Sequence, residues 1–202
     1  MMPLKKISSY LVILILLFSC NNSEKKLTKT DANYSMTSQG KSVGWTAYKF
    51  TEKVGVKGVF DDFEIKTASD SVSIETLLKT SRISIKTQSV NSKLEIRDVK
   101  LRDVFFNTFN TEIIKGEILN ADSGKGILAL SMNDITEEIA YNYNLKEDTL
   151  FVNTNLHLIK WKAEKALDTL NKVCYDLHKG ADGVSKLWPD VSIVIKIPVT
   201  KN

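Results

Sequence analysis

The sequence has few of the residues that build stapled or metal-held folds, with only two cysteines and two histidines among 202 residues. That number excludes a disulfide framework and an all-protein zinc cluster. Proline and glycine are also scarce, at 3 and 9 residues, while 43% of the chain is hydrophobic. These proportions exclude a collagen-like, linker-dominated or disordered chain. We therefore expect one globular domain of ordinary composition.

The chain also lacks a strong charge of either sign, because 28 basic residues face 24 acidic ones. Lys5 and Lys6 are the only charged residues among the first nineteen, so loss of that segment would leave a net charge of +2. So mild an excess does not indicate a nucleic-acid-binding protein. A Gly-rich phosphate loop and a zincin motif are absent as well.

The first nineteen residues have the three parts of a secretory signal. Lys5 and Lys6 form a positively charged n-region, and residues 11–18 form an uninterrupted apolar h-region. The small Ser19 stands at the cleavage position. Eight residues of helix rise only about 12 Å, far less than a bilayer core of roughly 30 Å. We therefore expect residues 1–19 to be a signal peptide.

Leu17-Phe18-Ser19-Cys20 resembles a bacterial lipobox, in which the cysteine is diacylated with fatty acids such as palmitate and becomes the mature N-terminus. A plain signal peptide with an incidental Cys20 is the alternative. Two acyl chains give lasting anchorage to a membrane. Polar residues follow up to position 41, so residues 20–41 predict a flexible tether with a mean span of about 25 Å. The protein is thus expected to be a membrane-anchored lipoprotein of the periplasm or cell envelope.

From Ser42 onward, apolar and polar residues alternate with a period of two, which is typical of β-strands. A short polar connection at residues 146–148 predicts a hairpin, and residues 122–126 predict another turn. Helical spacing occurs near residues 74–78, 101–105 and 163–170. The expected strands cover residues 43–50, 56–66, 81–89, 112–120, 126–133, 137–145, 149–159 and 191–199.

Eight antiparallel strands with one apolar face each can form a sandwich or a closed barrel. Closure removes exposed edges, and eight strands surround an interior that side chains fill or that holds one small ligand. We favour an all-β fold, an eight-stranded antiparallel barrel over residues 42–202 with short helices at its ends.

The segment from Arg97 to Phe106 is the densest mixture of charged and aromatic residues. In one interpretation Arg97 and Arg102 lie at the barrel rim, where a guanidinium group meets a phosphate or carboxylate, and Phe105 and Phe106 line the entrance. In the other, Arg–Asp pairs hold a short helix in place while both phenylalanines fill the core.

Cys174, Asp176 and His178 form the one cluster that suggests catalysis. A nucleophilic cysteine needs a base within hydrogen-bond reach and a group that orients that base. Metal binding by Cys174, His178 and the distant His157 is a weaker alternative, because three ligands without regular spacing specify little. A buried cysteine beside a structural histidine is the simpler interpretation, so we expect no enzyme, no cofactor and no metal site.

Trp45-Thr46-Ala47-Tyr48-Lys49-Phe50, followed by Gly58-Val59-Phe60 and Phe63, resembles the opening of the YceI-like family of periplasmic lipid-binding proteins. Ser89, Arg97-Asp98, Leu101-Arg102 and Phe105-Phe106 match the most recognisable stretch of that family. The resemblance spans residues 42–199. It departs from the family at residues 133–136, where a glycine-containing turn is usual, and at residues 161–190, which include Trp188.

The resemblance implies a lipocalin-like antiparallel barrel around a long apolar tunnel, since known members hold polyisoprenoid chains or other long amphiphiles. We therefore expect non-catalytic binding, sequestration or transport of such a molecule. An enzyme using Cys174 and His178, or a purely structural barrel, remain the alternatives. The expected ligand-binding residues are Trp45, Phe60, Phe63, Arg97, Arg102, Phe105, Phe106, Tyr143 and Trp161.

Overall fold

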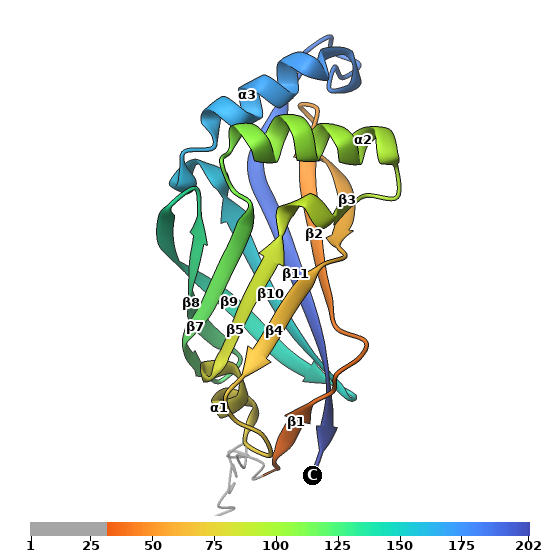
Figure 1. Ribbon diagram of the computed structural model, residues 1–202. Helices are drawn as coiled ribbons and strands as arrows, with labels where there is room; N and C mark the ends of the chain where they lie inside the picture. The colour runs from red at the N-terminus through yellow and green to blue at the C-terminus, as the bar shows by residue number, and fades with distance from the viewer. Residues whose placement is uncertain (1–31) are drawn as a thin grey trace, which may run out of the picture. The chain divides into compact units, whose positions relative to one another are not determined.

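The computed structural model describes residues 32–202. The predicted signal peptide, Cys20 and the first part of the predicted tether lie outside the described residues. Figure 1 shows the elements. The strands are β1 (Tyr34–Met36), β2 (Ser42–Lys49), β3 (Val54–Phe60), β4 (Phe63–Thr67), β5 (Ser81–Lys86), β6 (Val90–Asn91), β7 (Ile113–Asp122), β8 (Lys125–Met132), β9 (Ile135–Lys146), β10 (Thr149–His157) and β11 (Leu187–Lys201). The α-helices are α1 (Ile74–Lys79), α2 (Glu95–Lys100) and α3 (Glu164–Val173).

The strands form one curled antiparallel sheet in the order β4-β5-β7-β8-β9-β10-β11-β2-β3-β6, and β1 pairs with β11. The all-β antiparallel prediction is confirmed, but the predicted strand number is wrong, because the described residues contain eleven strands. The predicted strand 56–66 divides at Asp61 and Asp62 into β3 and β4. The other additions, β1 and β6, have three and two residues, too few to show an alternating pattern.

The bend between β3 and β4 joins the two sides of the curled sheet. β3 pairs with β2 along Val54–Phe60, whereas β4 pairs with β5 along Phe63–Thr67. At the bend, the Asp61 N–H donates to the Ser89 carbonyl (3.0 Å), and the Asp62 carbonyl accepts from the Lys86 N–H (3.0 Å). One bent segment therefore belongs to both sides and brings them together.

The predicted tether ends earlier than expected. Tyr34–Met36 pair with Val199–Lys201 of β11, and the Tyr34 N–H donates to the Val72 carbonyl (2.8 Å). Tyr34 and Met36 pack against the core, so residues 34–41 are part of the fold. No helix of the described residues is long and apolar enough to span a bilayer.

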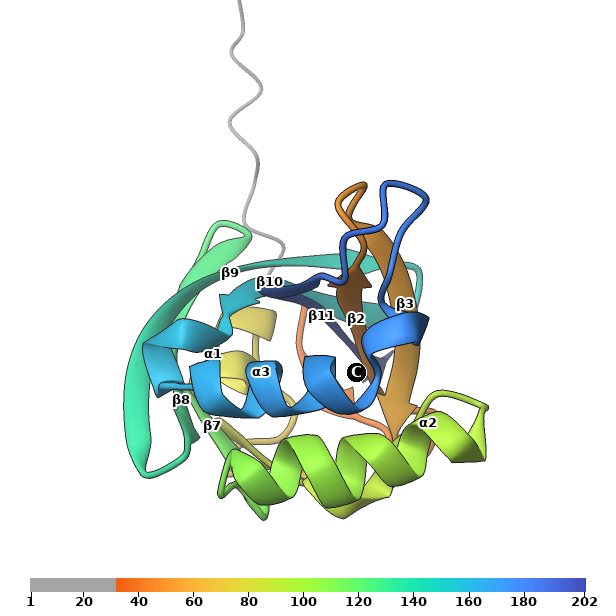
Figure 2. The same ribbon diagram turned by 90° about the horizontal axis from the view of Figure 1, so that it is seen from above.

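The three predicted helices are confirmed, and they lie at the two ends of the curled sheet (Figure 1). α1 buries Leu77 and Leu78 at one end, and the Ser73 hydroxyl caps it by accepting from the Thr76 N–H. At the other end α3 crosses the opening of the curled sheet and α2 runs along the edge of that opening, as Figure 2 shows from above. α2 continues directly into η2 (Leu101–Phe106), which has π-helical hydrogen bonding.

The turn at residues 133–134 forms without the glycine that is usual in the family that this sequence resembles. Met132 pairs with Ile135, so Asn133 and Asp134 are the two loop residues, with φ values of 47° and 57°. Positive φ at both positions fits a type I′ turn, which asparagine and aspartate tolerate better than other non-glycine residues. The predicted hairpins at residues 122–126 and 146–148 are confirmed by the pairing of β7 with β8 and of β9 with β10.

Candidate functional site

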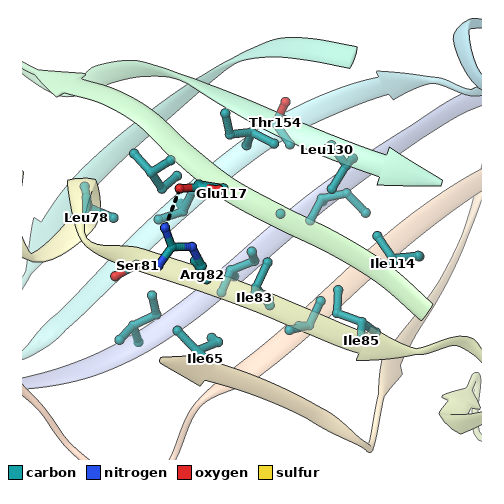
Figure 3. Close-up of a pocket in the computed structure, with 18 of the residues that line it drawn as sticks. Ile65, Leu78, Ser81, Arg82, Ile83, Ile85, Ile114, Glu117, Leu130 and Thr154 are labelled. Carbon is teal, nitrogen blue, oxygen red and sulfur yellow. Dashed lines mark hydrogen bonds and ion pairs between the residues drawn. The ribbon is translucent and has the colours of Figure 1, made fainter. Parts of the chain in front are cut away.

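Inward-facing side chains of the curled sheet surround an apolar cavity of about 100 Å³, here called the inner cavity (Figure 3). Aliphatic residues of β4, β5, β7, β8, β10 and β11 provide most of its lining, among them Ile65, Ile83, Leu130 and Ile195. Arg82 and Glu117 lie at its border, but their side chains are 68% and 50% exposed and pair with each other at 2.7 Å. The interior itself is therefore lined by apolar groups.

A second apolar cavity of about 120 Å³, the outer cavity, lies between the sheet and the helices α3 and η2. Its lining includes Trp45, Phe105 and Phe106, together with Trp188 of β11. Both cavities share five lining side chains, here called the waist. These are Phe60, Ile114, Met132, Leu156 and Ile193. One layer of apolar side chains thus separates two compartments of the same interior.

A third cavity of about 270 Å³, here called the mouth, adjoins the outer cavity and shares Trp45 and Leu101 with it. Four basic side chains line the mouth, and exposed apolar residues lie beside them. The first group is Lys49, Arg97, Lys100 and His178, and the second includes Leu94, Ile96 and Leu177. The apolar interior therefore leads to a basic opening.

Trp45 is fixed by its cross-strand neighbours. It pairs with Gly58 of β3, and its indole N–H donates to the Val59 carbonyl (3.2 Å). A Cβ built on Gly58 would lie 2.2 Å from the indole ring. Gly58 thus lets the ring lie against β3, where it lines both the outer cavity and the mouth.

The phenylalanines of η2 form a packed cluster at the waist. The ring centroids of Phe60 and Phe106 lie 6.1 Å apart, those of Phe105 and Phe106 5.1 Å, and those of Phe105 and Phe109 5.5 Å. Tilted and edge-on rings at these separations attract one another beyond their burial. The cluster holds η2 against the sheet and forms one wall of the outer cavity.

The mouth concentrates positive charge. The Lys49 ammonium group donates to the Leu177 carbonyl (2.8 Å). Burial, and then the nearby Arg97, hold the pKa of Lys49 below its usual value. Burial, and then Lys49 and Lys100, lower the pKa of His178 to about 4. Among residues 32–202, Lys49, Arg97 and Lys100 form no ion pair, so an anionic group would fit this opening.

Five of the nine predicted ligand-binding residues line these cavities, namely Trp45, Phe60, Arg97, Phe105 and Phe106. The other four lie elsewhere. Arg102 pairs with Glu95 on the helix surface, and Phe63 packs against the core outside the cavities. The Tyr143 hydroxyl lies 3.3 Å from a Glu75 oxygen of α1. Trp161 is fully buried, and its indole N–H donates to the Leu130 carbonyl (3.0 Å).

The two lysines of the mouth and most of the waist were not predicted from the sequence. Lys49 lies within the segment that carries the resemblance, and Lys100 stands between Arg97 and Arg102, but neither was singled out. Ile193 was assigned only to a strand. The segment 161–190 does shape one end of the interior, since Leu170 and Trp188 line the outer cavity.

Cys174 and His178 both line the mouth. Cys174 is buried, and no hydrogen bond joins its thiol to His178 within residues 32–202. The His178 Nδ1 lies 3.0 Å from the Asn171 side-chain oxygen, which can only accept, so Nδ1 donates. In the same range, no three His, Cys, Asp or Glu side chains are placed to hold a metal ion.

No family model matches the sequence, and no curated protein does so either. The fold, however, matches solved structures. A polyisoprenoid-binding domain from Saccharophagus degradans, implicated in plant cell wall breakdown, aligns with a TM-score of 0.58 and 13% identity over 85% of this chain and 99% of that domain. A mutant YceI protein with a monobromobimane guest gives 0.52 and 19% over 76% and 89%. BcnA of Burkholderia cenocepacia gives 0.50 and 12% over 79% and 96%.

Two of these structures carry the names that the resemblance in residues 42–199 suggested. At identities of 12–19%, the similarity concerns the fold. The chain therefore has a YceI-like fold, a curled antiparallel sheet with helices at its ends.

Proposed function

We propose that this chain is a YceI-like protein that binds a long-chain amphiphile, such as an isoprenoid with an anionic head group, and catalyses no reaction on it. The tail lies in the apolar interior and the head group lies in the mouth between Lys49, Arg97 and Lys100. The observation that carries the proposal is the succession from an apolar interior to an opening with three cations outside any ion pair of residues 32–202.

The interior competes with a bilayer rather than with water. Transfer of each methylene group from water contributes roughly 0.8 kcal/mol, but a membrane offers the same gain. The net free energy of loading therefore depends on how well the tail fits and on what the head group contacts. Charge-assisted hydrogen bonds from Arg97 and the two lysines would favour a phosphate or carboxylate over an alcohol.

A long tail requires the waist to move. An apolar cavity of about 150 Å³ holds a molecule as small as benzene, and the inner and outer cavities measure about 100 and 120 Å³. Met132 and Phe60 separate them, and methionine adopts many shapes at little cost. A tail that displaces these side chains would join both compartments.

We propose further that Cys20 carries the acyl anchor that its lipobox indicates, on the periplasmic side or in the cell envelope. Conversion of Cys20 to Ser is expected to release the protein from membranes that are washed in high salt, which screens electrostatic contacts. Unchanged association of Cys20→Ser with membranes in high salt would contradict lipidation.

The test of head-group recognition compares a prenyl phosphate with the uncharged prenol of the same length. Arg97→Gln/Lys100→Gln is expected to weaken phosphate binding by at least tenfold and to leave prenol binding within about twofold. Lys125→Gln/Lys146→Gln, exposed on β8 and β9 and outside all three cavities, is the matched control and should leave both unchanged. Equal loss of phosphate and prenol binding, or no loss of either, would contradict the role given to the mouth.

A thiol or metal chemistry at Cys174 is the rival function. Cys174 lines the mouth but is buried and has no side-chain hydrogen bond to His178 within residues 32–202. Its thiol offers the head group no charge-assisted hydrogen bond, so we expect Cys174→Ala to leave lipid binding nearly unchanged. Loss of a measurable redox or hydrolytic activity in Cys174→Ala would support the rival instead.

A further inference from the structure

Large hydrophobic side chains are exposed mainly around the mouth. Six of the ten in the described residues lie on α2, α3 and the turns next to them, here called the rim. The rim consists of Leu94, Ile96, Val99, Val173, Tyr175 and Leu177. Val54, at the start of β3, and Val184 lie beside two neighbouring loops, which Thr51 and Asp182 join by a hydrogen bond of 2.6 Å. Only Ile113 and Leu119 lie elsewhere, on β7.

The rim and the mouth share residues. Leu94, Ile96 and Leu177 belong to the rim and also line the mouth. In Figure 2 the helices α2 and α3, which carry the rim, lie side by side over the same end of the curled sheet. Any surface that covers the rim therefore also faces the opening of the interior.

Charged residues alternate with the apolar residues of the rim, and cations are in excess, because Glu95 pairs with Arg102 and the buried Asp98 accepts from the Ser92 N–H. Lys93, Arg97 and Lys100 stand next to Leu94, Ile96 and Val99 in the sequence, and these three cations make no ion pair within residues 32–202. Ile96 is 66% exposed and Leu177 59% exposed. Apolar residues that enter the acyl boundary, with cations at the level of the head groups, are typical of interfacial membrane binding.

We propose that the rim docks on a bilayer that contains anionic lipids. Charge complementarity favours this occupant over a second copy of the chain. Two copies that met face to face would bring Lys93, Arg97 and Lys100 of one against the same residues of the other, and such like-charge contacts oppose association. An anionic lipid surface neutralises them.

Docking gives the proposed lipid a dry path, because the tail can pass between bilayer and interior without crossing water. The inference rests on the proposed function for this role, but the docking itself requires no bound lipid. It also adds to the anchor at Cys20, since a tether alone does not orient the mouth toward the membrane.

The test measures flotation of the full chain, in its Cys20→Ser form, with vesicles of phosphatidylcholine alone or with about 30 mol% phosphatidylglycerol, an anionic lipid whose surface potential attracts cations. The rim variant is Val99→Ser/Val173→Ser/Tyr175→Ser, which avoids residues that line the mouth. The matched control is Ile113→Ser/Leu119→Ser, exposed on β7. All proteins carry the same first 31 residues, so differences arise at the substituted positions.

We expect the parent and the control to float with the anionic vesicles and the rim variant to bind at least tenfold more weakly. Binding of the parent should also fall with added salt and with phosphatidylcholine alone. Equal flotation of rim variant and parent would overturn the inference. So would a parent that is dimeric in sedimentation, becomes monomeric in the rim variant and does not float.

Lipid content and melting temperature of the same proteins separate this inference from the proposed function. If the rim variant is folded, contains lipid and still floats, docking through the rim is contradicted and the proposed function is not. A parent that floats in a rim-dependent way, yet takes up no prenyl lipid, supports docking and contradicts the proposed function.

Discussion

Gly58 lies opposite Trp45 in the β2–β3 ladder, and the indole ring occupies the space that a side chain at position 58 would need. The residue without a side chain therefore allows the largest side chain of β2 to lie against the neighbouring strand. The absence of a Cβ at Gly58 of β3 thus determines where the Trp45 ring lies, and with it the shape of the mouth and of the outer cavity.

Gly58→Ala is expected to destabilise the protein by about 1–3 kcal/mol, as overpacking of a well-packed site does, and to weaken lipid binding as the indole moves. Urea unfolding and a prenyl-lipid titration measure the two effects. Gly44→Ala on β2 is the control, because its nearest neighbour would be at 3.5 Å, an ordinary contact. Equal stability of Gly58→Ala and Gly44→Ala would contradict the packing described.

The waist should set the longest tail that fits. Ile193 lines both the inner and the outer cavity, so Ile193→Phe is expected to fill the passage between them. The substitution should reduce binding of a long prenyl chain by at least tenfold and spare a short one that reaches only the outer cavity. Titration of the parent and the variant with two chain lengths measures this. Parallel loss of both lengths, in a variant that melts like the parent, would count against a two-compartment interior.

Acid should destabilise the fold through His178. Its pKa is lowered to about 4 in the folded protein, against about 6.5 when unfolded. Between these values the unfolded state binds more protons than the folded state. The contribution of His178 to the free energy of unfolding is therefore fully present above pH 6.5 and is lost as the pH falls toward 4. Solvent screens this half-buried ring, so the effect should be at most about 2 kcal/mol.

His178→Gln removes this titration and keeps an amide that can donate to Asn171. The loss of stability between pH 7 and pH 4 is therefore expected to be smaller in His178→Gln than in the parent. Urea unfolding across this range measures the difference, and identical slopes would show that His178 does not carry it.

An anion in the mouth should reverse the effect of burial on Lys49. Burial and Arg97 hold the pKa of Lys49 below its usual value, and a bound phosphate or carboxylate would raise it. At a pH near or above the lowered pKa, binding should therefore be accompanied by proton uptake, and the affinity should weaken as the pH rises through that pKa. Calorimetry in buffers of different ionisation enthalpy detects the proton, and Lys49→Gln should abolish the uptake. Uptake that persists in Lys49→Gln would assign it to another group.

Patterns along the chain predicted the parts of the fold that depend on near neighbours. The alternation in residues 139–158 predicted the β9–β10 hairpin, and the spacing of Ala166 and Leu170 predicted α3. The bend at Asp61 was missed, because residues 56–66 were predicted as one strand although Val59-Phe60 and Asp61-Asp62 interrupt their alternation. The partner strand changes there from β2 to β5, and pairing between distant strands decides that change.

The site was predicted in the same uneven way. Phe105 and Phe106 were predicted from the charged and aromatic segment 97–106 and from the family resemblance. Lys49 and Lys100 line one mouth only because the sheet curls and α2 runs along the edge of its opening. Trp161 and Tyr143 were chosen as bulky aromatics, but each points to a backbone or carboxylate partner away from the cavities. Residue type predicted which side chains are buried, and the register of the sheet decided which of them line the interior.

Native mass spectrometry of the protein purified without detergent from bacterial cells tests the central claim most directly. We expect one molecule of a long-chain, anionic lipid per protein, released by organic extraction and much reduced in Ile193→Phe. A protein that retains no lipid, and takes up none from prenyl-phosphate vesicles, would show that the interior is only a packed core.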